Sequence, residues 1–122
     1  MGEARIVATA RTPIGTAFKG TLRDVTAYDL GIHAVTNVVA RAGIDPERYD
    51  DVILGESRQG GGDLARYAAT ESGLMDVPGL ANNRHCASGL AAVATAAGSI
   101  RAGMDKVVIA GGAESASTAP RF

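Results

Sequence analysis

The sequence has few aromatic residues and almost no net charge. Aromatic residues make up 4% of the 122 residues, and there is no tryptophan. This scarcity argues against surfaces that bind by stacking, such as aromatic cages or base-stacking platforms. The formal net charge is −1, with acidic and basic residues mixed along the chain. Since nucleic-acid binders need a concentrated basic surface, we expect no nucleic-acid partner.

Cysteine is also scarce, because Cys86 is the single one in the chain. No disulfide can form within the chain, which favours a reducing compartment, so we expect a cytoplasmic protein. No uninterrupted apolar run is long enough to cross a bilayer, so we expect no membrane partner. With one cysteine and two distant histidines the sequence offers no zinc-ligand spacing, and we expect no metal.

Small residues are abundant instead. The chain contains 16 glycines, and much of its apolar content of 46% is alanine. An alanine-filled core buries little apolar area per residue, at about 25 cal/mol per Å². A stable fold therefore needs more surface than this chain supplies, which indicates a fragment or an obligate oligomer.

Apolar periodicity and turn residues predict an alternation of strands and helices. The expected strands are residues 5–10, 51–55 and 106–110, and the expected helices are residues 26–42, 64–73 and 86–102. A further extended segment is expected over residues 80–85. This alternation is typical of an α/β domain with a mostly parallel sheet.

The third expected helix, residues 86–102, has no polar face. Its only polar side chains within the apolar run are Ser88, Thr95 and Ser99, which do not form a stripe. A helix that is apolar all round is buried on all sides, so we expect a buried central helix. A chain of this size can hardly enclose such a helix alone.

Cys86 stands at the expected start of that helix, directly after an extended segment. Unpaired N–H groups at a helix N-terminus favour an anion, and the anionic thiolate is the form that attacks thioesters. Ala87, Ser88 and Gly89 are small enough to let a substrate approach. The alternative is an inert, buried cysteine that acts as a small apolar residue, and on these grounds the two interpretations are about equal.

For the two histidines and the glycine run, the sequence favours structural roles. His85 neighbours Cys86, but successive side chains of an extended segment point to opposite faces, so we do not expect a Cys–His pair. His33 lies on the first expected helix as a surface or interface residue. The Gly60-Gly61-Gly62 run matches neither a dinucleotide-binding nor a P-loop pattern and reads as a turn leading into a helix.

Three segments resemble the thiolase family in the family's order. Residues 83–90 read N-R-H-C-A-S-G-L and resemble the thiolase acyl-enzyme cysteine motif. Residues 110–117 read A-G-G-A-E-S-A-S and resemble the A-G-G-x-E-S-x-S segment, and residues 10–20 resemble the opening R-T-P-I/F-G-x-F-x-G. The resemblance covers essentially the whole chain.

The resemblance implies that Cys86 is the catalytic nucleophile, which carries the acyl group as a thioester. It implies thiolytic cleavage of a 3-ketoacyl-CoA, as in fatty-acid β-oxidation, or Claisen condensation of acyl-CoA units. Coenzyme A and acyl-CoA are then substrates, and no cofactor is permanently bound. The implied fold is the N-terminal half-domain of an αβαβα sandwich with a buried central helix, in a homodimer or homotetramer. No CoA-binding residue is assigned.

Two positions depart from the thiolase pattern, and expected residues are absent. Asp63 stands where many members have asparagine in G-Q-N-x-A-R, and Asn82 stands where a small threonine is usual. The family's catalytic histidine, its second cysteine and its CoA-binding loop domain belong to later parts of the chain. We therefore expect residues 1–122 to be an incomplete N-terminal domain, inactive as a thiolase without a C-terminal half.

Two alternatives to a thiolase remain open. One is a ketosynthase-type condensing enzyme, which uses a similar cysteine at a helix start with carrier-bound or CoA-bound acyl groups. The other is a non-catalytic half-fold that serves in binding or assembly, with an unreactive Cys86.

Overall fold

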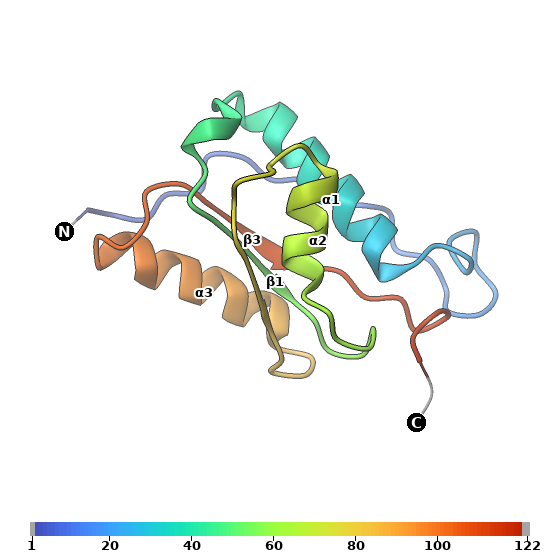
Figure 1. The fold of residues 1–122 in the computed structure, drawn as a ribbon. Helices are drawn as coiled ribbons and strands as arrows, with labels where there is room; N and C mark the ends of the chain where they lie inside the picture. The colour runs from blue at the N-terminus through green and yellow to red at the C-terminus, as the bar shows by residue number, and fades with distance from the viewer. Residues whose placement is uncertain (1, 121–122) are drawn as a thin grey trace.

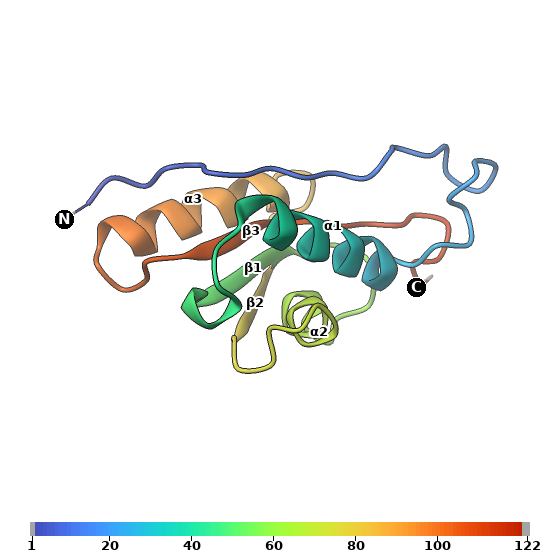
Figure 2. The ribbon, with the colours of Figure 1, turned by 90° about the horizontal axis from the view of Figure 1, so that it is seen from above.

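A three-stranded parallel sheet lies between helices on both of its faces (Figures 1 and 2). The computed structural model describes residues 2–120; Met1, Arg121 and Phe122, which belong to the expected 1–122 domain, lie outside the described residues. The strands lie in the order β2-β1-β3. Their bounds are β1 Asp51–Gly55, β2 Gly79–Asn82 and β3 Val108–Gly112. The predicted α/β class with a parallel sheet is confirmed.

The helices divide between the two faces of the sheet. Helices α1 (Ala27–Ala42) and α2 (Leu64–Glu71) cover one face, and α3 (Ser88–Arg101) covers the other (Figure 2). A short 3₁₀ helix, η1 (Pro46–Arg48), precedes β1. The crossover from β1 to β2 thus contains α2, and the crossover from β2 to β3 contains α3.

The central strand β1 provides core residues to both faces. Val52 and Leu54 are buried in the cluster formed with α1 and α2, whereas Ile53 is buried against Ala92 and Ala96 of α3. This division follows from the alternation of side chains along a strand. A strand buried on both faces reads as a continuous apolar run, as residues 52–54 do.

Helix α1 begins and ends where its capping residues stand. Thr26 is the N-cap: its hydroxyl accepts from the Asp29 N–H at 3.1 Å, and the Asp29 carboxylate accepts from the Thr26 N–H at 3.4 Å. Gly43 closes the helix in the left-handed region with φ 65°. The reciprocal bonds form a capping box, and glycine suits the left-handed closing position, so the expected helix is confirmed at both ends.

Helix α3 and strand β3 begin two residues later than expected. Ala87 is the N-cap of α3, so Cys86 lies in the turn before the helix rather than in its first turn. Strand β3 starts at Val108 because the backbone N–H groups of Lys106 and Val107 donate to the Asp50 carboxylate, at 2.6 and 3.1 Å. The Asp50 carboxylate thus accepts from the backbone N–H groups that would otherwise extend the strand.

The expected strand at residues 5–10 is wrong. This segment has no strand assignment, and its Ile6 and Val7 are 78% and 72% exposed. It runs past β3 and α3 in an irregular path, with Thr9 O accepting from Arg41 Nη1 at 2.9 Å (Figure 2). Beta-branched residues favour a pleated surface only where a neighbouring strand and packing receive them, and none of the three described strands pairs with residues 5–10.

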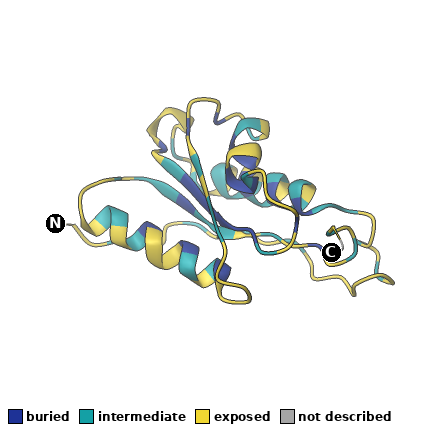
Figure 3. Cartoon of the chain, turned by 60° about the horizontal axis from the view of Figure 1, so that its bottom comes forward, coloured by how far each residue is buried: buried dark blue, intermediate teal, exposed yellow. Residues whose placement is uncertain are grey.

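Helix α3 is buried on one side within this chain. Ser88, Ala92 and Ala96 face the sheet, whereas Leu90 is 75% exposed and Val93 is 39% exposed (Figure 3). The apolar outer side accounts for the absence of a polar stripe in the sequence. Among the described residues, no helix is long and apolar enough to cross a membrane.

Gly79 allows β2 to approach α2 closely. A Cβ added at Gly79 would lie 2.5 Å from Arg66 Cα and 2.6 Å from the Ala65 carbonyl carbon. Both are backbone atoms, which cannot rotate away as a flexible side chain can. The contact therefore depends on the missing side chain at this position.

The first prediction compares two glycine substitutions. Gly79→Ala should destabilise the fold by about 1–3 kcal/mol or more, because the new methyl overlaps the α2 backbone. Gly98→Ala should stabilise it by about 0.5–1 kcal/mol, because Gly98 is helical and an added Cβ meets nothing within 4 Å. Urea unfolding followed by circular dichroism measures both, and equal effects of the two substitutions would contradict this packing.

The second prediction concerns acid stability. The bonds from Lys106 and Val107 hold the pKa of the Asp50 carboxyl below its ordinary value. A lowered folded-state pKa stabilises the fold fully above the ordinary carboxyl pKa of about 3.9, and this contribution is lost as the pH falls through the lowered value. Asp50→Asn should therefore be less stable than the parent protein at pH 7, and the difference should shrink on acidification.

Urea unfolding at a series of pH values tests this. Asp76→Asn, which removes an exposed carboxylate from the loop before β2, is the matched control and should show a much smaller difference. A gap between Asp50→Asn and the parent protein that stays constant from neutral to acidic pH would contradict the assignment.

Candidate functional site

Two of the three thiolase-like segments, around Cys86 and around Glu114, lie at the carboxyl end of the sheet beside the segment that follows β1. Because β1, β2 and β3 are parallel, the segments that follow them leave the sheet at the same end (Figure 1). These segments are residues 56–59, residues 83–87 with Cys86, and residues 113–117. In open α/β sheets, ligands bind at the carboxyl ends of the strands.

Cys86 lies in a tight turn between β2 and α3, and it is exposed. The backbone N–H groups of Ala87 and Ser88 donate to the carbonyls of Arg84 and His85, at 3.0 and 3.1 Å. Helix α3 has no side-chain cap, since its N-cap is Ala87. The Ser88 N–H is therefore engaged, and the other first-turn N–H groups of this uncapped helix remain available to water or to an anion.

The turn rests against the end of the central strand. A Cβ added at Gly55 would lie 2.7 Å from Ser88 Cβ and 3.0 Å from Gly89 N. The end of β1 therefore passes directly beneath the start of α3, where a larger residue would push the turn outward.

Glu114 joins the segments that follow β1 and β3. Its carboxylate Oε2 accepts from the backbone N–H groups of Ser57 at 3.2 Å and Arg58 at 2.9 Å. The Ser57 hydroxyl in turn donates to Asn83 Oδ1 at 3.4 Å. One carboxylate thus connects the A-G-G-x-E-S-x-S segment to the loop beside the Cys86 turn.

Glu56 organises the glycine run and is a residue that the sequence analysis missed. Its side chain is buried, accepts from the Leu64 N–H at 3.2 Å at the start of α2, and contacts the Gln59 amide nitrogen. Gln59 Nε2 also donates to Gly61 O at 2.8 Å. A glutamate directly after a buried strand and four residues before a glycine run was the available signal. The glycines therefore form a fixed turn leading into a helix.

Within the described residues, neither His85 nor His33 forms a side-chain pair with Cys86. His85 is exposed, with φ 50°, so it lies in the turn rather than on the extended segment expected for residues 80–85. Strand β2 ends at Asn82, and α1 carries His33 on its exposed surface. No group of three potential metal ligands occurs within residues 2–120.

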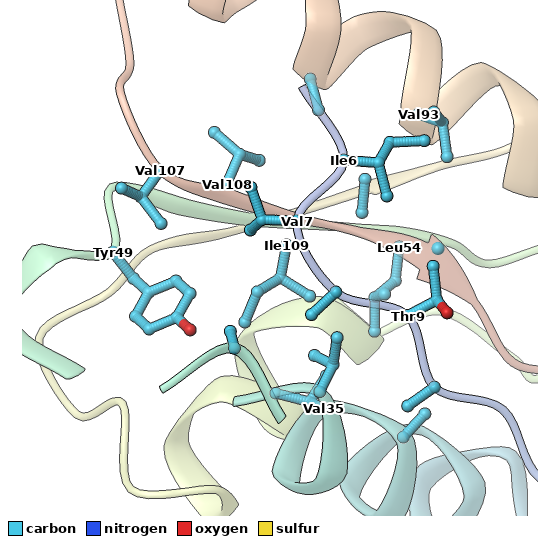
Figure 4. Close-up of a pocket in the computed structure, with 18 of the residues that line it drawn as sticks. Ile6, Val7, Thr9, Val35, Tyr49, Leu54, Val93, Val107, Val108 and Ile109 are labelled. Carbon is cyan, nitrogen blue, oxygen red and sulfur yellow. The ribbon is translucent and has the colours of Figure 1, made fainter. Parts of the chain in front are cut away.

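The structure also contains a cavity away from Cys86. A mainly apolar cavity of about 480 Å³ separates residues 4–10 from β3, α1 and α3, and Cys86 does not line it (Figure 4). Tyr49 lines it with a hydroxyl that has no hydrogen-bond partner among the described residues, and burial raises the pKa of Tyr49. The cavity follows from the loose position of residues 4–10 and offers no nucleophile.

The third prediction tests the Glu114 connection. Glu114→Ala should speed amide hydrogen exchange at Ser57 and Arg58 by about five- to a hundredfold, since bonds to a charged acceptor contribute about 1–3 kcal/mol. Glu114→Gln keeps one acceptor oxygen and should have a smaller effect. NMR measures the exchange, and Glu71→Ala, at an exposed glutamate ending α2, serves as control. Unchanged exchange in Glu114→Ala would show that the carboxylate does not hold this loop.

Comparison with known proteins agrees with this arrangement. Residues 4–122 match the family described as "Thiolase, N-terminal domain". A "Probable acetyl-CoA acyltransferase" of Staphylococcus aureus is 40% identical over 123 aligned residues, which cover 98% of this chain and 31% of that protein. A "3-ketoacyl-CoA thiolase" of Bacillus subtilis is 44% identical over 125 aligned residues, which cover 98% of this chain and 32% of that protein.

A solved structure shows the same fold. The acetyl-CoA acetyltransferase of Bacillus anthracis superposes with a TM-score of 0.89 at 41% sequence identity, over 94% of this chain and 30% of that chain. The present chain thus spans about a third of the length of these relatives. With a family match over nearly its whole length and the fold of a solved relative, the chain belongs to the thiolase family as an N-terminal domain.

Proposed function

We propose that this domain carries the acyl-accepting nucleophile of an acyl-CoA C-acyltransferase, and that Cys86 is that nucleophile. The observation that carries the proposal is the position of Cys86, exposed in a turn before the uncapped N-terminus of α3, within the segment that resembles the thiolase cysteine motif. An inert structural cysteine would instead be buried.

In the proposed first step, the Cys86 thiolate attacks the carbonyl carbon of an acyl-CoA. A new carbon–sulfur bond forms at Cys86, the bond to the CoA sulfur breaks, and CoA leaves as a thiolate that takes up a proton. In the second step the bond between the acyl carbon and Cys86 Sγ breaks, and Cys86 leaves as the thiolate. The acyl carbon bonds to the sulfur of a CoA that gives up its thiol proton, or to the α-carbon of a second acyl-CoA that gives up an α-proton, and in both cases the proton goes to a base outside these residues. The N–H groups at the start of α3 favour the thiolate before attack and negative charge on the substrate oxygen during it.

We propose that the remaining catalytic groups lie outside these 122 residues. Within residues 2–120, the side chain of His85 forms no hydrogen bond with Cys86, so His85 is not positioned as its base. The exposed apolar side of α3, with Leu90 and Val93, supports a further layer that covers this helix. We propose that this layer is the C-terminal half of the same enzyme and that the whole enzyme is an oligomer.

The fourth prediction is that acetyl-CoA acetylates Cys86. The chain is expressed in its native host with an affinity tag, so that any polypeptide bound to it is purified with it. Intact-mass and peptide analysis should show one acetyl group on Cys86, removable by hydroxylamine as a thioester is. Cys86→Ala should show none. The 122-residue chain alone should give no thiolysis of acetoacetyl-CoA.

The outcomes separate the possible functions. Transfer of the acetyl group to added CoA supports the thiolase, whereas transfer to an acyl carrier protein would indicate a ketosynthase-type enzyme. No acetylation of Cys86 in a chain purified with its companion polypeptide would refute the proposed nucleophile and favour a non-catalytic binding or assembly domain.

A further inference from the structure

We infer that Ser88 is a positioning residue, whose hydroxyl holds the turn that presents Cys86 to an acyl group. The inference rests on the function proposed above. Ser88 is 5% exposed, and its Oγ accepts from the Arg84 N–H at 2.7 Å and donates to the His85 carbonyl at 2.7 Å. Both contacts run back across the position of Cys86, from the first residue of α3 to the two residues before the cysteine.

The direction of these contacts identifies what the hydroxyl serves. A serine that caps a helix accepts from N–H groups further along the same helix. The Ser88 hydroxyl instead contacts only backbone groups that precede the helix. Its contribution is therefore to the geometry of the turn rather than to the stability of α3.

The turn needs such support because His85 has an unfavourable backbone conformation. Its φ of 50° lies in the left-handed region, which is disfavoured for a residue with a Cβ. Ser88 holds the His85–Cys86 peptide through the His85 carbonyl and the Asn83–Arg84 peptide through the Arg84 N–H. Asn83 Oδ1 holds the peptide between them, because it accepts from the His85 N–H at 2.9 Å. If these bonds are lost, His85 can return to negative φ, which reorients the peptide leading into Cys86.

The surroundings of Ser88 make its replacement by alanine informative. Its Cβ lies against Gly55, where an added Cβ would be 2.7 Å away, so space for a larger side chain is limited. Alanine keeps the Cβ and this packing, and it removes only the hydroxyl. Ser99→Ala is the matched control, because Ser99 Oγ donates to the Ala96 carbonyl at 2.9 Å in the same helix, away from the turn.

The fifth prediction uses two measurements on the 122-residue chain. Ser88→Ala should slow alkylation of Cys86 by iodoacetamide by about fivefold, the factor that corresponds to one lost hydrogen bond. It should also speed hydrogen exchange of the Arg84 amide by about the same factor, as measured by NMR. Ser99→Ala should leave both unchanged.

The outcomes distinguish this inference from the proposed function. Alkylation of Cys86 at the parental rate or faster in a folded Ser88→Ala chain overturns the positioning role, whatever the Arg84 exchange rate. If Ser88→Ala does not fold, it is combined with the stabilising Gly98→Ala, and alkylation of Cys86 is compared with that of Gly98→Ala alone. Slower alkylation then supports the role, and an unchanged rate overturns it. The proposed function fails separately if Cys86 of the parent chain reacts no faster than in the urea-unfolded chain.

Discussion

The close approach of backbones at two glycines is the constraint on which the arrangement of this domain depends. Gly79 brings β2 against the backbone of α2, and Gly55 brings the end of β1 against the start of α3. Each contact joins a strand to the helix that must cover it, on opposite faces of the sheet. Since neither position has room for a side chain, the distance between layers is set by the backbone.

The position of Cys86 follows from the second of these contacts. The turn that carries the cysteine leads from β2 into α3, and the start of α3 rests against the end of β1. The turn therefore has little freedom to move inward. Glu114 and Asn83 connect this turn to the loops after β3 and β1. The acyl-accepting role proposed for Cys86 thus involves a group held from several parts of the chain.

Much of the fold could be predicted because the determinants are local. Thr26 with Asp29 and Gly43 define the ends of α1, and the continuous apolar run of residues 52–54 identifies a strand buried on both faces. The prediction of strands failed where a segment distant in the sequence decides whether a strand forms and where it begins. Residues 5–10 have the composition of a strand but no neighbour that pairs with them, and β3 begins late because Asp50 takes its first donors.

The candidate site was predictable only as a motif. The segment around Cys86 identified the cysteine and placed it close to a helix start. The side chains that shape its surroundings could not be found from spacing, because Glu114 and Ser57 are 57 positions apart and meet only after the parallel strands align their ends. The left-handed His85 was equally hidden, since no glycine or asparagine stands there to indicate it.

The small side chains between α3 and the sheet affect which part of the domain unfolds first. Ala92 and Ala96 meet Ile53 with single methyl groups, so α3 is held along its length by little buried area. Its close attachment to the sheet is at its N-terminal end, where a Cβ added at Gly55 would lie 2.7 Å from Ser88 Cβ. Local opening begins where buried apolar contact is least, so α3 should detach as a unit before the face covered by α1 and α2. Any protein surface that clamps the outer side of α3 would then also control how long the thiol keeps its orientation.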